Sequence, residues 1–302
     1  MPKEMSSIAN LLSSPSTGSS IPSSSLSALW CYILPALDRI LQSNSDAKHA
    51  PVLPITAEYY IGIYTHCYDY FIAQSNSTIG LSGLYKNLDH YYANAAHQLF
   101  TGAPNDNTLI PYILAKFKYY SAGTAAIDRL LSYLNHHYVK PAVNDGNGWF
   151  SFDDDAVVTG DKGHNSGSKV SWGEGEDRRV AELKKWGYKG GSSASVLAKA
   201  EACAEAASTL DCVVPLSSLA LRRFRTNFIE PLMQVSNINH KIKHDSSVTT
   251  EAGQLVRIVK EMLEMKGVGE DENRQLAKLA VILKTIGVRH NKLLRKKPRA
   301  TH

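Results

Sequence analysis

The sequence predicts an all-α protein, a helical bundle or solenoid unit. Apolar residues recur every three to four positions in successive segments, and the connections between those segments are short and carry Gly, Pro or Asp. No segment alternates apolar and polar residues as a half-buried strand does. Stripes of this kind are typical of helices that pack against their neighbours. The 302 residues can bury a sizeable core in one or two domains.

The composition indicates an intracellular protein without membrane spans. No run approaches the roughly 18 apolar residues of a membrane helix, and the first residues lack the apolar centre of a secretory signal. The four cysteines form no CxxC pair, so we expect reduced thiols, no metal site, and a location in cytoplasm and nucleus. These cysteines are Cys31, Cys67, Cys203 and Cys212.

The N-terminal part changes character near Leu26. Residues 1–25 are rich in Ser and Pro, with too few large apolar groups to offset the entropy of ordering, so we expect a disordered leader. A helical stripe follows, in which Pro35 should kink or restart the helix. Residues 51–56, PVLPIT, end it, and Thr56 can cap the next helix. The stripe is Leu26, Leu29, Trp30, Ile33, Leu37, Ile40 and Leu41.

Residues 58–71 (EYYIGIYTHCYDYF) form an aromatic helix. Tyr60, Tyr64 and Tyr68 lie one turn apart on one face, with Ile61 beside them. Tyr joins a large apolar body to a hydroxyl that prefers a wet edge, which suits a protein interface. The same spacing also fits a helix that packs this face on its own core. Spacing alone leaves both interpretations open.

Three further helices are expected before residue 144. The first stripe ends at the GAPND turn of residues 102–106, and Pro141 should close the last helix. The stripes are Leu84, Leu88, Tyr91, Ala95 and Leu99; Ile110, Ile113, Leu114 and Phe117; and Ile127, Leu130, Leu131, Leu134 and Tyr138.

The segment 145–210 is expected to be a long loop insertion. Its first part is rich in Gly, Asp and Ser and cannot easily bury enough surface to fold. Its second part, SSASVLAKAEACAEAAS, has helix propensity, but a lone helix this short is marginal. A retained intron or translation artefact is a further alternative that the sequence alone does not separate from a loop insertion.

The segment 211–288 carries the remaining helices, and a basic tail occupies 289–302. Two amphipathic stripes are separated by the turn at 267–271. They are Leu255, Ile258, Met262 and Met265, then Leu276, Leu279, Leu283 and Ile286.

Several segments, in the same order, resemble the N-terminal region of a cullin of the SCF type, the scaffold of multi-subunit ubiquitin ligases. YIGIYTHCYDYF (60–71) resembles the second helix of the first cullin repeat. Residues 80–99 and 119–140 are similar to its third to fifth helices, and 213–232 to the following segment, with Phe224 where cullins usually have Trp. The resemblance implies that residues 26–144 and 211–288 are cullin-repeat helices.

The resemblance also implies a function, which is recruitment by a scaffold that is not an enzyme and needs no cofactor. The second and fifth helices of a cullin bind a BTB-fold SCF adaptor, which carries F-box-type substrate receptors for ubiquitin-dependent degradation. The C-terminal cullin homology domain has no counterpart here, so the RING-subunit site is expected to be absent. The implied adaptor-binding residues are Tyr60, Ile61, Tyr64, Tyr68, Tyr133, Asn135 and His136.

One further motif resembles a modification site. LVRIVKEM (255–262) is similar to the IVRIMK motif whose Lys accepts a ubiquitin-like modifier in full-length cullins, which places Lys260 at the acceptor position. An ordinary amphipathic helix explains the same residues, with Lys260 on its solvated face.

Other functions stay open. A truncated cullin could compete with the intact scaffold or have no function. A basic tail could bind nucleic acid, direct nuclear import or aid solubility, but it lacks the interleaved aromatics of a base-stacking surface, so nucleic acid is not an expected partner. The sequence contains neither a GxSxG nor an HExxH motif, either of which would indicate an enzyme. The tail cations are Arg289, Lys292, Arg295, Lys296, Lys297 and Arg299.

Overall fold

The computed structural model confirms an all-α chain over the residues that it describes. Helices hold most of these residues, and the extended pairing among them is limited to a single bridge between Leu12 and Ile55. None of the helices in the described part has the length and apolar character to cross a membrane. The described residues are 11–15, 21–43, 55–73, 77–150, 172–234, 253–264 and 269–289.

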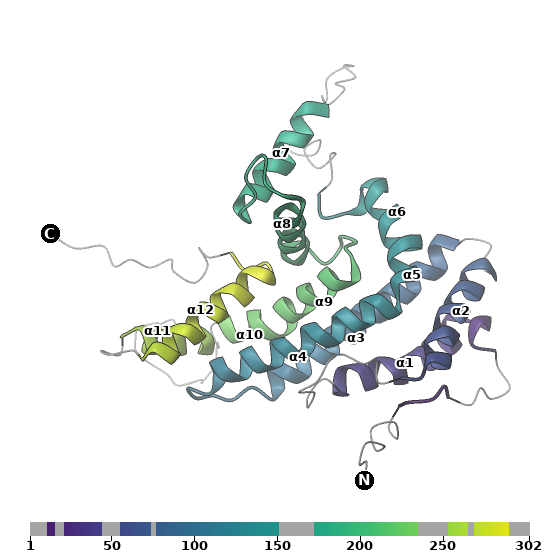
Figure 1. The fold of residues 1–302 in the computed structure, drawn as a ribbon, viewed down its shortest axis with the longest axis horizontal. Coiled ribbons are helices and arrows are strands. Elements are labelled where there is room, and N and C mark those ends of the chain that lie inside the picture. Colours follow the sequence, from purple (N-terminus) through teal and green to yellow (C-terminus); the bar gives the residue numbers. More distant parts are fainter. Residues whose placement is uncertain are drawn as a thin grey trace, which may run out of the picture.

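Four helices build the N-terminal half (Figure 1). The long third helix contacts the first two, and the fourth contacts the first. Tyr92 and Tyr120 join the third and fourth, with ring centroids 6.4 Å apart. The helices are α1 (Leu26–Ser43), α2 (Ala57–Ala73), α3 (Ser77–Thr101) and α4 (Leu109–Leu130).

The starts of α1 and α2 are capped as local chemistry dictates. Ser25 Oγ accepts a hydrogen bond from Ala28 N at 3.1 Å, and Thr56 Oγ1 accepts one from Tyr59 N at 3.2 Å. The predicted Thr56 cap is therefore confirmed. Pro35 lies inside an uninterrupted α1, so the expected restart is wrong. Pro35 lacks the N–H that would bond to the carbonyl of Cys31, four positions earlier, and Cys31 is an exposed residue.

The N-terminal leader, residues 1–25, differs in part from the expected disorder. Leu12 O accepts a hydrogen bond from Thr56 N at 3.0 Å, and a 3₁₀ turn at Pro22–Ser24 packs on α1 and α2 with Pro22 buried. Disorder across 1–25 is therefore wrong for residues 11–15 and 21–25, because a few apolar contacts and one backbone pairing hold them. Residues 1–10 and 16–20 lie outside the described part.

The predicted fourth and fifth helices are joined differently from the expectation. α4 runs without a break through the first stripe and the start of the second, to Leu130, and Leu131 leaves helical geometry. Pro141 does not close the run, because π-helical turns on both sides accommodate its missing N–H, and the helix ends near Gly146 with φ +88°. The short elements are α5 (Ser132–Leu134), η2 (Asn135–Val139), α6 (Lys140–Ala142) and η3 (Val143–Asn147).

The expected loop insertion at 145–210 contains two helices, α7 (Trp172–Lys185) and α8 (Ala194–Ala207), so the loop expectation is wrong for this part. They enclose a small second core, and α8 also packs on α9. Tertiary packing supplies what a lone helix lacks. Residues 151–171 lie outside the described part. The second core consists of Leu183, Trp186, Ala200, Cys203 and Ala204.

The C-terminal helices pack back onto the long pair. The first of them lies along α3, and the last lies on α4. The aromatic rings of Phe224 and Phe228 are fully buried at the centre, and Met265 of the predicted stripe lies outside the described residues. The elements are α9 (Leu216–Phe224), η4 (Arg225–Ile229), α10 (Glu230–Met233), α11 (Gln254–Glu264) and α12 (Glu270–Thr285).

The seam between α3 and α9 combines a hydroxyl and an ion pair. Tyr85 Oη donates to Val214 O at 3.1 Å and accepts from Val214 N at 3.0 Å. One turn further, Arg223 Nε donates to Asp89 Oδ1 at 2.6 Å, and the same two side chains make a second charged contact. This bidentate pairing is the strong form of a carboxylate–guanidinium contact.

The Tyr85 hydroxyl should matter for stability. We expect Tyr85→Phe to lower the free energy of unfolding by about 1–3 kcal/mol, because both backbone groups of buried Val214 lose a partner. Urea unfolding measures the change. Tyr119→Phe is the control, since the Tyr119 hydroxyl makes no hydrogen bond within the described part, and equal stabilities of the two variants would contradict the role of the seam.

Candidate adaptor-binding surface

Helix α2 carries aromatic residues on two opposite faces. Tyr59, Ile63 and Cys67 are buried against the core, and Tyr59 Oη donates a hydrogen bond to Tyr32 O. Tyr64 and Tyr68 face outward and are 46% and 45% exposed. The interpretation in which the tyrosine stripe packs on the core is therefore wrong for Tyr64 and Tyr68, whereas Tyr60 is half-buried against the core. The fully buried stripe is shifted by one residue.

The outward tyrosines rest on Tyr133 of α5. The Tyr133 ring lies edge to face with Tyr64, Tyr68 and Phe71, at centroid distances of 5.7, 6.1 and 5.7 Å, and His137 stacks on it at 4.1 Å. Tyr133 itself is buried, and this burial, followed by the charges of Tyr64 and Tyr68, raises the pKa of its phenol. Tyr133 thus supports the surface from beneath.

The other residues expected at this surface differ in their roles. Asn135 is turned inward: its Nδ2 donates to Asp128 Oδ1 at 2.8 Å and its Oδ1 accepts from Leu216 N at 3.1 Å. His136 is exposed. Tyr60 is half-buried and donates to Arg129 O at 3.3 Å. The second- and fifth-helix residues do come together, but Tyr133 and Asn135 act as supports beneath the exposed layer.

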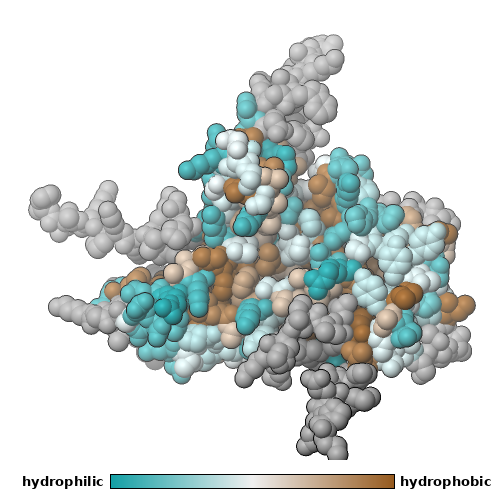
Figure 2. Space-filling view, in the orientation of Figure 1, coloured by the Kyte–Doolittle hydropathy of each residue, from teal (hydrophilic) through white to brown (hydrophobic). Residues whose placement is uncertain are grey.

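Ile61 and Ile72 complete the surface as exposed aliphatic side chains, 62% and 61% accessible. Four of the ten large hydrophobic residues that are exposed in the described part lie on α2, which concentrates them on one helix face. Hydrophobic side chains are visible among paler ones over α2 at the right of Figure 2. Sequence reasoning missed Ile72, although it lies four residues after Tyr68, and His137, four after Tyr133.

Charged residues border this apolar centre. Glu58 and Asp69 of α2 are exposed, as are Arg129 and Lys140 at the ends of the neighbouring elements. An apolar centre inside a polar rim is the usual anatomy of a protein–protein interface. The arrangement can hold a partner but contains no catalytic constellation.

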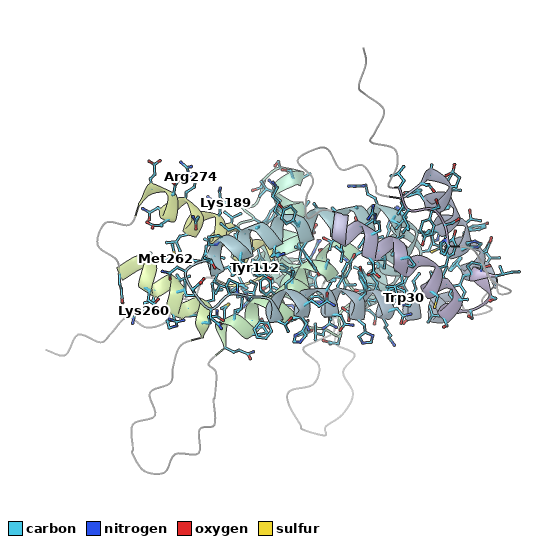
Figure 3. All side chains as sticks on the ribbon, turned by 90° about the horizontal axis from the view of Figure 1, so that it is seen from below. Trp30, Tyr112, Lys189, Lys260, Met262 and Arg274 are labelled. Atoms are coloured by element: carbon cyan, nitrogen blue, oxygen red, sulfur yellow. The ribbon has the colours of Figure 1, made fainter. Side chains whose placement is uncertain are left out.

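The remaining sequence candidates lie away from this surface. Lys260 is exposed on α11, with its Nζ 3.6 Å from Glu264 Oε1, at the end of the molecule opposite Trp30 (Figure 3). Of the basic tail only Arg289 is described, and it pairs with Glu182 at 2.6 Å beside the Trp186 ring. No group of three potential metal ligands occurs within the described ranges.

Comparison with known proteins gives no match: no family model, no curated protein and no solved structure matches this chain.

Cysteine labelling can test the orientation of α2. Cys67 lies on the buried face, where burial raises the pKa of its thiol to about 12, whereas Cys31 is exposed on α1. We expect iodoacetamide to label Cys31 in the native protein at least about 100-fold faster than Cys67, because alkylation needs an accessible thiolate. Mass spectrometry gives both rates, and equal rates would mean that α2 is turned differently.

Asn135 should act through stability. We expect Asn135→Ala to lower the free energy of unfolding by about 1–3 kcal/mol, because Leu216 N and Asp128 each lose a partner. Neighbouring His136 is exposed, so His136→Ala should stay within about 0.5 kcal/mol of the original protein. Chemical denaturation compares the two, and an unaffected Asn135→Ala variant would remove the supporting role of Asn135.

Proposed function

We propose that this chain is a cullin-like scaffold of an SCF-type ubiquitin ligase, active in cytoplasm and nucleus. It binds a BTB-fold adaptor through the outward face of α2 and, through that adaptor, F-box-type substrate receptors for ubiquitin-dependent degradation. Two observations support the proposal: several segments resemble the N-terminal region of a cullin, and α2 presents an exposed aromatic and aliphatic face. Its action is recruitment, without bond chemistry.

The observation that carries the proposal is the exposure of Tyr64 and Tyr68 over Tyr133. Aromatic side chains at interfaces contribute strongly because they bury large areas with few rotatable bonds. Here edge-to-face contacts already hold the rings in position. Their side chains therefore lose little conformational entropy when a partner binds. The flanking Ile61 and Ile72 extend the apolar area along the same helix.

The proposal is tested by titrating the folded protein with the SCF adaptor and with other BTB-fold adaptors in a calorimeter. We expect Tyr64→Ala to weaken binding at least about 30-fold, the effect of losing a hot-spot side chain worth 2 kcal/mol or more. The variant should stay folded with unchanged helix content, since Tyr64 is 46% exposed and the loss of its ring contact with Tyr133 costs only about 0.5–1.5 kcal/mol.

A matched pair of variants distinguishes specific binding at the α2 surface from non-specific hydrophobic association. Ile61→Ser on α2 and Val281→Ser on α12 both remove an exposed aliphatic side chain, 62% and 66% accessible. Only Ile61→Ser should weaken the complex, by about 10-fold, the effect of a loss near 1.4 kcal/mol. The proposal fails if the folded chain binds none of these adaptors, or if Tyr64→Ala and Ile61→Ser bind as well as Val281→Ser.

A further inference from the structure

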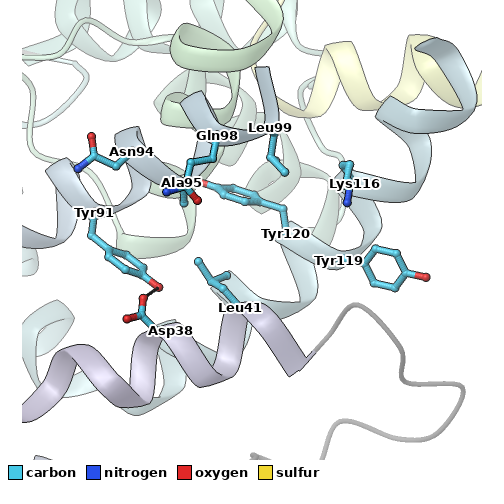
Figure 4. Close-up of a pocket in the computed structure, with 10 residues that line it drawn as sticks. All are labelled: Asp38, Leu41, Tyr91, Asn94, Ala95, Gln98, Leu99, Lys116, Tyr119 and Tyr120. Carbon is cyan, nitrogen blue, oxygen red and sulfur yellow. Dashed lines mark hydrogen bonds between the residues drawn. The ribbon is translucent and has the colours of Figure 1, made fainter. Parts of the chain in front are cut away.

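A groove of about 390 Å³ lies where α1, α3 and α4 meet, away from the α2 surface (Figure 4). Small-ligand sites usually have volumes of this order and combine apolar walls with a few placed polar groups. Asp38 and Lys116 lie toward opposite sides of the groove. Its lining thus offers one carboxylate, one ammonium group and an apolar floor between them.

The carboxylate is held in place by a tyrosine. Tyr91 Oη donates to Asp38 Oδ1 at 3.0 Å, and burial of this phenol, followed by the negative charge of Asp38, raises its pKa. The Tyr91 ring therefore stays beside the carboxylate as a neutral wall. Asp38 has no ion-pair partner within the described residues. A carboxylate next to an aromatic wall is a favourable environment for an organic ammonium group.

The ammonium group belongs to Lys116 of α4. Its Nζ lies 5.4 Å from the centroid of the Tyr112 ring, and no carboxylate pairs with it in the described part of the chain. Lys116 is half-buried, as expected where its aliphatic stem packs on the surface of α4. An anionic group on a ligand can take the place of the missing partner.

The floor between the two charges is apolar. Tyr120, Leu41 and Leu99 line this floor, and the Tyr120 hydroxyl is occupied by a hydrogen bond that it donates to Ala220 O at 3.1 Å. On the rim, Asn94 and Gln98 lie one turn apart on α3 and carry amides that can donate to and accept from a peptide group.

We propose that this groove binds a short zwitterionic peptide, with its ammonium end at Asp38, its carboxylate end at Lys116 and an apolar side chain on the floor. Lys116 disfavours a polyamine, and Asp38 disfavours a fatty acid or a phosphate ester, because each would bring a like charge to one end of the groove. The proposal does not depend on the function proposed for α2.

The experiment uses the full chain and three forms of one tripeptide. Gly-Leu-Gly carries both charges, its N-acetyl form lacks the ammonium group, and its C-terminal amide lacks the carboxylate. We expect calorimetry to show binding of Gly-Leu-Gly, weakened by about 10-fold in each blocked form, since one charge-assisted contact is worth about 1.4 kcal/mol.

Two variants assign each charge to its partner. Asp38→Asn keeps an acceptor for Tyr91 and should bind free and N-acetyl peptide equally, whereas Lys116→Met should bind free and amidated peptide equally. Lys86→Met, on an exposed position of α3 outside the groove, should behave as the original protein. Thermal unfolding confirms that all three variants are folded.

The proposal is overturned if Gly-Leu-Gly does not bind at about 10 mM, a concentration that would detect even millimolar affinity. It is also overturned if the three peptide forms bind alike, or if Asp38→Asn and Lys116→Met respond to the blocking groups as Lys86→Met does.

Discussion

The seam between α3 and α9 is the constraint on which the rest of the structure depends. Tyr85 fixes Val214 just before α9 begins, and the Asp89–Arg223 pair fixes the helix near its C-terminal end. α3 also contacts α1 and α2. Through Asn135, which binds Leu216 N, the same seam determines where the α5 turn lies. The position of Tyr133 under α2 therefore follows in part from the contacts between α3 and α9.

A buried cation strengthens this region. Arg222 is almost fully enclosed, and its Nη1 donates to Thr209 O at 2.7 Å and to Cys212 O at 2.9 Å, while burial lowers its pKa. These carbonyls belong to the connection between α8 and α9. The helices inside the expected insertion are thus attached to the core by hydrogen bonds to a charged group, which are stronger than neutral ones.

The sequence predicts the helices well because each carries its own periodic stripe, and the Thr56 cap follows from local chemistry. It cannot decide which face of α2 is buried, since Tyr59 and Tyr60 are equally suited to a core, and only the positions of Tyr32 and Tyr133 choose between them. The supporting roles of Tyr133 and Asn135 depend on partners up to 81 residues away. α7 was missed because its stability comes from packing on α8.

The most direct test of the central claim, that the outward face of α2 is an adaptor-binding surface, is hydrogen exchange on the chain with and without the SCF adaptor. The account predicts slowed exchange in residues 57–73 and 132–140, with residues 254–264 and 270–285 unchanged. Protection confined to the latter two helices, or no protection anywhere in a saturated complex, would contradict it.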